Sequence, residues 1–179
     1  KILSTGNLNQ YDTIVVGIRA SQVRPDFVAN NGRLLDFVKN GGTLIVQYQQ
    51  QEYVRMNLQP LPAKMDSNIR TVDENAPVKI LQPTHPIFNY PNKITDKDFE
   101  NWVQERNLYT FTSFDEKYIP LLETHDEGEP ESKGGMLYAE IGKGKYIYTS
   151  FSWFRQLPVG NQGAYRIFAN MLSLGGKKK

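Results

Sequence analysis

Neutral polar and aromatic residues stand at the carboxyl ends of two strand-like runs of this sequence, and an arginine follows a third run. These candidate ligand-binding residues are Arg19, Gln47, Tyr48, Gln49, Ser152, Trp153 and Arg155. Ligands of open parallel sheets bind beyond the carboxyl ends of the strands, so we expect these residues to line one concave surface. Their donors and the indole suit a polyhydroxylated ligand better than acid–base catalysis. The alternative is that the two arginines make structural hydrogen bonds to loop carbonyls.

The groups that most catalytic or metal sites require are missing from the sequence. It contains no cysteine, which excludes disulfides, thiolate metal sites and a cysteine nucleophile. The two histidines, His85 and His125, have no partner at a metal-like spacing. Gly142-Lys143-Gly144 is followed by a strand-like run, whereas a phosphate loop opens a helix. The sequence therefore predicts no metal and no cofactor.

Acidic residues leave a second function open. Glu105, Asp115 and Glu116 could serve a hydrolase that acts on a sugar derivative. Paired carboxylates do this work only at a specific separation, which sequence spacing does not give. A purely structural or oligomerisation domain is the third alternative.

Charge and hydropathy exclude two classes of partner. The formal net charge is +2, but three of the basic residues form the terminal run 177–179. The body is thus close to neutral, which argues against a nucleic-acid-binding face. No run approaches the ~20 apolar residues that span a membrane. We expect neither nucleic acid nor a membrane span.

The first half of the chain predicts a parallel strand–helix–strand unit. Thr13–Ile18 and Thr43–Tyr48 are continuous apolar, β-branched runs, as in strands buried on both faces. Between them, Pro25 starts a helical pattern that ends at Asn40-Gly41-Gly42. Residues 49–94 hold six of the ten prolines and no clear period, which predicts an irregular excursion.

The second half predicts shorter elements and one clear helix. Thr95-Asp96-Lys97-Asp98 resembles a capping box, so a short helix should run through Trp102. Tyr118–Thr124 is predicted to be a strand, and the runs 136–141 and 145–151 are predicted to form a hairpin. Apolar residues spaced by three and four predict a sheet-packed helix over 163–174. We assign residues 1–176 to one α/β domain and residues 177–179 to a basic tail.

Several motifs resemble known families. Residues 11–20 (YDTIVVGIRA) and 35–47 (LDFVKNGGTLIVQ) resemble the strand, helix and GGTL-strand of class I glutamine-amidotransferase-like domains. Residues 98–109 (DFENWVQERNLY), 154–158 (FRQLP) and 163–166 (GAYR) resemble the C-terminal region of bacterial PIG-L (LmbE-like) deacetylases. The resemblance implies a flavodoxin-like, mainly parallel sheet flanked by helices, with a late hairpin. It also implies that the first strand–helix unit lies upstream of Lys1.

The resemblance brings no complete catalytic set. The deacetylases use a His-Pro-Asp-Asp motif in an N-terminal domain, whereas this chain has His85-Pro86-Ile87-Phe88. The amidotransferases need a cysteine near Gln47–Gln49 and a His–Glu pair near Phe151–Phe154, and neither is present. We therefore expect a non-catalytic accessory domain of a PIG-L-type deacetylase. It would pack on an upstream deacetylase domain of the same polypeptide or contact glycan, in a secreted or periplasmic protein.

Overall fold

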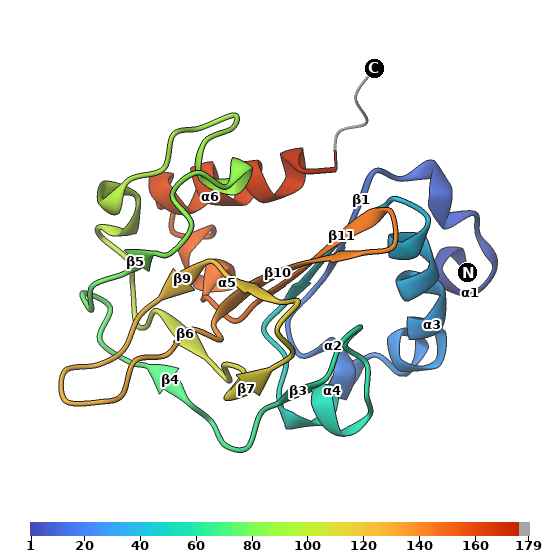
Figure 1. Ribbon diagram of the computed structural model, residues 1–179, viewed down its shortest axis with the longest axis horizontal. Coiled ribbons are helices and arrows are strands. Elements are labelled where there is room, and N and C mark those ends of the chain that lie inside the picture. Colours follow the sequence, from blue (N-terminus) through green and yellow to red (C-terminus); the bar gives the residue numbers. More distant parts are fainter. Residues whose placement is uncertain (176–179) are drawn as a thin grey trace.

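A mixed α/β architecture is built around one five-stranded sheet in the computed structural model, which describes residues 1–175 (Figure 1). The strand order is β1-β2-β11-β10-β8. β1, β2 and β11 are parallel neighbours, and β10 is antiparallel to both β11 and β8. Four of the five strands therefore point the same way. The strands of this sheet are β1 (Thr13–Val16), β2 (Thr43–Gln47), β8 (Ile119–Pro120), β10 (Met136–Ile141) and β11 (Gly144–Thr149).

The expected parallel pairing of the first two strands is confirmed. Thr13 pairs with Thr43 and Val16 with Val46 in a parallel register. The first four residues of β2 are fully buried, because the strand lies between two others and both its faces are covered. The expected hairpin is also present, with Ile141 paired to Gly144 at its turn.

Helices cover the two faces of the sheet. α3 (Pro25–Lys39) has proline at its start and Asp26 in its first turn, and Gly41 follows its end with φ 111°. α6 (Gln162–Ser173) begins at Asn161, whose side chain accepts a hydrogen bond from the Ala164 amide. α3 belongs to one hydrophobic cluster and α6 to the other, on opposite faces. The helices predicted after Pro25 and over 163–174 are thus confirmed.

Short elements make up the rest of the described chain. The remaining helices are α1 (Ile2–Thr5), α2 (Ala20–Val23), α4 (Gln51–Arg55) and α5 (Trp153–Gln156), with 3-10 turns η1 (Leu8–Gln10), η2 (Pro86–Phe88) and η3 (Asp96–Phe99). The remaining strands form three two-stranded pairs: β3 (Ala63–Lys64) with β7 (Ser113–Phe114), β4 (Arg70–Thr71) with β6 (Asn107–Leu108), and β5 (Lys79–Ile80) with β9 (Leu122–Glu123). The proline-rich excursion is thereby joined, pair by pair, to the segment 107–123. None of the described helices is long and apolar enough to cross a membrane.

Two sequence predictions are wrong in detail. The capping box at Thr95 is present, but the turn that it starts ends at Phe99, and Asn101 has φ 57°. Trp102 leaves the helical path because its ring packs in the core against Phe151 and Trp153. The strand predicted over 118–124 is divided at Leu121 into β8 and β9, which pair in different sheets. The predicted basic tail lies outside the described residues.

Buried tyrosines are expected to make the fold less stable at alkaline pH. Burial raises the pKa of Tyr138 to about 12, and it also raises the pKa values of Tyr53, Tyr118, Tyr146 and Tyr148. An unfolded chain ionises its tyrosines near pH ~10. The free energy of unfolding should therefore be insensitive to these groups below about pH 10 and should fall as pH rises above it.

This loss of stability is expected as one cooperative step in a pH titration. Phenolate absorbance should rise together with loss of the near-ultraviolet circular dichroism. Ionisation of all ten tyrosines with the dichroism unchanged would contradict the expectation.

Candidate functional site

The carboxyl ends of β1, β2 and β11 meet at one edge of the sheet, because the three strands are parallel neighbours. The backbone N–H of Arg19 donates to the carbonyl oxygen of Tyr48 over 2.8 Å. The ring of Tyr48 stacks on that of Phe154 at 5.8 Å and 22°. The segments that follow the three strands therefore lie side by side.

A chain of side-chain contacts runs along this edge. The Arg19 Nε donates to Gln22 Oε1 over 2.7 Å, the Gln22 Nε2 donates to Gln50 Oε1, and the Gln50 Nε2 donates to the Tyr48 hydroxyl over 2.7 Å. At the far end, the guanidinium of Arg155 lies 4.9 Å from the ring centroid of Phe154. We call this set the carboxyl-edge cluster; its members are Arg19, Gln22, Tyr48, Gln50, Phe154 and Arg155.

Backbone strain marks the same edge. Arg19 has φ 54° and ψ 20°, which places a non-glycine residue in the left-handed region directly before α2. Tyr109, whose ring lies 5.8 Å from that of Tyr48, has φ 53°. Such conformations cost of order 1–3 kcal/mol each and persist where surrounding contacts hold them. The Tyr48 carbonyl holds the amide of Arg19, and the Tyr109 carbonyl accepts from the buried Tyr148 hydroxyl.

Gln49 is a structural residue of this edge. Its side chain is buried, and its Oε1 accepts from the Ser21 amide over 2.9 Å. Its Nε2 donates to the carbonyl oxygens of Gly17 and Gln47, each over 2.8 Å. The amide group thus ties the turn after β1 to the end of β2. Gln47 takes part through its backbone carbonyl, which accepts from Gln49, and the residue itself is half-buried.

Replacing this amide by an apolar group should therefore destabilise the chain. A Gln49→Met variant keeps the volume but leaves a buried N–H and two carbonyls without their partner, at a cost of about 2 kcal/mol. Urea unfolding measures the change. Gln51→Met, at the start of α4 where the side-chain contacts are open to water, is the matched control and should be close to neutral. Equal unfolding midpoints for the two variants would contradict the structural assignment of Gln49.

Ser152 and Trp153 do not reach the ligand-accessible surface, which corrects the prediction made for them. Both residues have no exposed area. The Trp153 indole N–H donates to Thr149 Oγ1 over 2.8 Å, and its ring packs on Trp102 and Phe151. The residue follows a strand end, as expected, but α5 starts there and turns the ring inward beneath α6.

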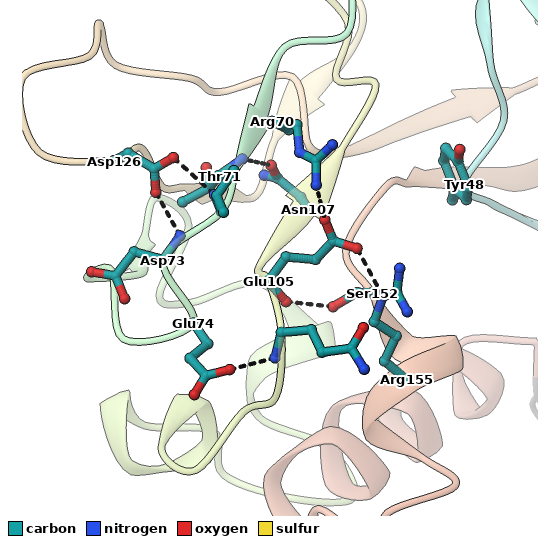
Figure 2. Close-up of polar contacts among 12 residues, drawn as sticks. Tyr48, Arg70, Thr71, Asp73, Glu74, Glu105, Asn107, Asp126, Ser152 and Arg155 are labelled. Atoms are coloured by element: carbon teal, nitrogen blue, oxygen red, sulfur yellow. Dashed lines mark hydrogen bonds and ion pairs between the residues drawn. The ribbon is translucent and has the colours of Figure 1, made fainter.

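Glu105 is the buried acid of the site, and two arginines hold it (Figure 2). Its side chain is 3% exposed; Oε1 accepts from Arg155 Nε and Oε2 from Arg70 Nη2, each over 2.8 Å. Its backbone carbonyl accepts from the Ser152 hydroxyl over 2.6 Å. We call Arg70, Glu105 and Arg155 the Glu105 clamp. Because both carboxylate oxygens are occupied by cations, Glu105 is poorly placed to act as a general acid or base.

The other two acids that sequence reasoning considered do not join Glu105. Asp115 accepts from the Lys117 amide in a local turn, and Glu116 is exposed. The described residues contain no group of three or more His, Cys, Asp or Glu side chains that could hold a metal ion. His125 pairs with Glu123 over 2.6 Å, and burial lowers the pKa of His85.

Polar side chains fix the segments around Arg70 and Glu105, as Figure 2 shows. The Asn107 Oδ1 accepts from the Thr71 amide over 2.9 Å, and the Asp126 carboxylate accepts from the amides of Val72 and Asp73, each over 2.8 Å. Glu74 accepts from the amide of Gln104. A cavity of about 670 Å³ lies beside β4, with Arg70, Asp126 and Thr110 in its lining.

Sequence reasoning missed several members of the site. Gln50 adjoins the predicted Gln49, and Phe154 lies between the predicted Trp153 and Arg155, so both had a local signal. Gln22 lies in the short helix α2, where no pattern distinguished it. Arg70 had no signal at all, because it lies 35 residues from Glu105 in the sequence.

Comparisons with known proteins give the fold but no family. No family model matches the chain, and no curated protein matches it. Among solved structures, the cytoplasmic protein STM3548 from Salmonella typhimurium is similar at TM-score 0.59 and 18% identity, over 93% of this chain and 72% of that one. STM1381 from Salmonella typhimurium LT2 gives TM-score 0.56 and 17% identity, over 98% and 79%.

A larger protein contains the same fold as a part. The β-galactosidase from Rahnella sp. R3 is similar at TM-score 0.56 and 14% identity, over 96% of this chain but only 23% of its own. At these identities the likeness concerns architecture alone. The chain is an α/β domain with a central, mostly parallel sheet flanked by helices.

Proposed function

We propose that this chain is a non-catalytic accessory domain whose carboxyl-edge cluster contacts carbohydrate. In finer detail, we propose that its architecture is flavodoxin-like, of the class I glutamine-amidotransferase type, and that it belongs to a larger PIG-L-type deacetylase. The observation that carries the proposal is the state of the polar groups at the carboxyl edge. The side chains of Gln49 and Glu105 are held in structural bonds, whereas Arg19 is exposed and Gln22, Gln50 and Arg155 are partly exposed.

The elbow after β2 supports the absence of catalysis. The resembled amidotransferases place a nucleophile near Gln47–Gln49, and in this chain Gln49 makes three hydrogen bonds to backbone groups. Glu105 is the buried acid nearest this edge, and it is held by two guanidinium groups. Neither side chain is free to attack a substrate or to move a proton.

The exposed groups of the cluster support a neutral, hydroxyl-rich ligand. Arg19 is exposed, Gln22 and Gln50 are half-buried, and Arg155 is stacked beside the half-buried ring of Phe154. An aromatic face with amide and guanidinium donors around it matches a sugar ring, which offers an apolar face and a rim of hydroxyls. The β-galactosidase comparison is consistent with a module, since this fold accounts for 23% of that enzyme's chain.

Calorimetry on the purified chain tests the carbohydrate proposal. The panel contains oligosaccharides of N-acetylglucosamine and of galactose. We expect one of them to bind, and we expect Arg19→Asn and Phe154→Leu each to weaken binding at least about tenfold, since about 1.4 kcal/mol lost per contact corresponds to that factor. Asparagine is chosen at position 19 because it tolerates the left-handed backbone.

The matched control is Arg24→Asn, which removes an exposed arginine that pairs with Asp26 and lies outside the cluster. It should bind like the parent chain. Absence of binding to every sugar, or equal binding by all four proteins, would reject the carbohydrate proposal. The accessory role is tested separately by the full reading frame, in which we expect an upstream domain with a His-Pro-Asp-Asp motif.

A further inference from the structure

Arg106 is a buried cation that has no ion-pair partner among the described residues. It is 4% exposed. The buried acids of the described chain each contact a basic side chain, and they are Asp98, Glu105 and Glu123. Arg106 therefore differs from the other buried charges, because no carboxylate of the described residues compensates it.

Backbone carbonyls hold the Arg106 guanidinium in place without neutralising it. Its Nε donates to the carbonyl oxygen of Ala76 over 2.9 Å, and its Nη1 donates to that of Phe99 over 2.5 Å. The guanidinium carbon lies 5.5 Å from the ring centroid of Trp102. A guanidinium carries five N–H donors, and Nη2 has no acceptor among the described residues. The group is thus fixed in position but retains free donors.

The charge of Arg106 is unfavourably placed for a residue without a counter-ion. Burial lowers its pKa to about 10, and the carboxylates of Asp73 and Glu74 oppose this shift from beyond ion-pair distance. Asp73 accepts from the Asn75 amide, and Glu74 accepts from the Gln104 amide. Arg106 remains charged at neutral pH. An anion that reached the guanidinium would therefore gain a charge-assisted hydrogen bond and offset the cost of burial.

A cavity of about 880 Å³ opens beside this guanidinium. Its walls come from the two segments that Arg106 joins, residues 75–80 with β5 and residues 94–101 with η3. Nη2 is not one of the fully buried polar atoms that lack a partner, so it reaches the cavity. The apolar part of the lining includes Val78, Ile80, Ile94 and Phe99.

The other charges of the cavity lining limit what anion it can take. Lys79, Asp96 and Glu100 also line it, and all three are exposed. Two acids at the mouth repel a group with several negative charges, such as phosphate. A single negative charge on an apolar body suits this combination of one buried guanidinium, an apolar wall and an acidic rim.

We propose that this cavity binds a small organic monocarboxylate with an apolar body. The carboxylate accepts from the free guanidinium N–H groups of Arg106, and the apolar body packs on Val78, Ile94 and Phe99. Such a ligand supplies the negative charge that the described residues do not place beside Arg106. No member of the carboxyl-edge cluster lines the cavity, so this inference does not depend on the carbohydrate proposal.

A nuclear magnetic resonance titration of the full chain tests the proposal with two probes of nearly equal shape. Phenylacetate should shift the Arg106 Nε–H signal and the Val78 and Ile80 amides to saturation. Phenylacetamide, which has no charge, should bind at least about tenfold more weakly, because hydrogen bonds between charged groups are the stronger ones. Inorganic phosphate should also bind more weakly than phenylacetate. Absence of saturable shifts at these groups, equal binding of the two phenyl probes, or phosphate binding as tight as that of phenylacetate overturns the proposal.

Variants locate the binding charge. Arg106→Met should weaken phenylacetate binding at least about tenfold. Because Arg106 also joins two segments, Lys79→Glu is a second variant that leaves those contacts intact. At low ionic strength it should weaken binding about threefold, as expected for an exposed charge. Lys64→Glu is the control; it reverses an exposed lysine on β3, outside the cavity lining, and should bind like the parent. A folded Arg106→Met chain that binds like the parent overturns the proposal, and so does equal binding by the two lysine variants.

Discussion

The double variant Arg70→Met/Arg155→Met should lose about 4 kcal/mol of unfolding free energy. Glu105 is 3% exposed, whereas its two partners are 41% and 34% exposed at the side chain. Removing both cations strands a buried carboxylate, which costs about 3–5 kcal/mol in comparable pairs. Methionine retains the apolar stems of the arginines, so the loss reports on charge rather than packing. Urea unfolding of the variant and the parent measures it.

Replacing Glu105 instead of the arginines is the control, because Glu105 is buried whereas the two arginines are partly exposed. Glu105→Gln leaves two arginines that can turn to water, and it should cost only about 1 kcal/mol. Each single arginine variant should fall between these values, with the two effects non-additive because they share one carboxylate. A Glu105→Gln loss as large as that of the double arginine variant would contradict the assignment of Glu105 as the buried partner.

The second large effect is expected at the start of α6. A Cβ placed on Gly163 would lie 1.9 Å from the carbonyl oxygen of Asp98, which is backbone and cannot turn aside. Gly163→Ala must therefore push α6 away from η3, and we expect a loss of about 3 kcal/mol. The Asp98 carboxylate also accepts from Arg166 Nε on α6 over 2.7 Å, so the displacement disturbs that contact too.

A second helical glycine provides the control. A Cβ placed on Gly32 in α3 would meet nothing within 4 Å beyond its chain neighbours and the backbone of its own helix. Gly32→Ala should stabilise the chain by about 0.5–1 kcal/mol through helix propensity alone. Unfolding curves of the two variants should therefore shift in opposite directions, and a shift in the same direction would show that propensity, not the contact with Asp98, controls α6.

The spacing of apolar residues predicted the main elements, because the buried face of a strand or helix determines which of its own positions are apolar. The runs at 13–18 and 43–48 are apolar at nearly every position, and β2 is buried on both faces as this pattern predicts. The same prediction is wrong for β1, which is the edge strand of the sheet and leaves Val15 37% exposed. The helix over 163–174 has apolar residues at intervals of three and four, which present one face to the sheet. Where the prediction failed, as at Trp102, a distant contact decided: the ring packs on Phe151 and Trp153.

The sequence by itself determined the order of the main strands and helices along the chain and the absence of any cysteine chemistry. It also determined that polar residues follow three of the strands. Those properties depend on residue type and on neighbours in the chain. Only the tertiary structure decided which polar groups are free. Gln49 reaches back to Gly17 and Ser21, and Glu105 is held by arginines 35 and 50 residues away. Hydrogen-bond partners at such separations leave no periodic trace in a sequence, because folding alone brings them within about 3 Å of one another.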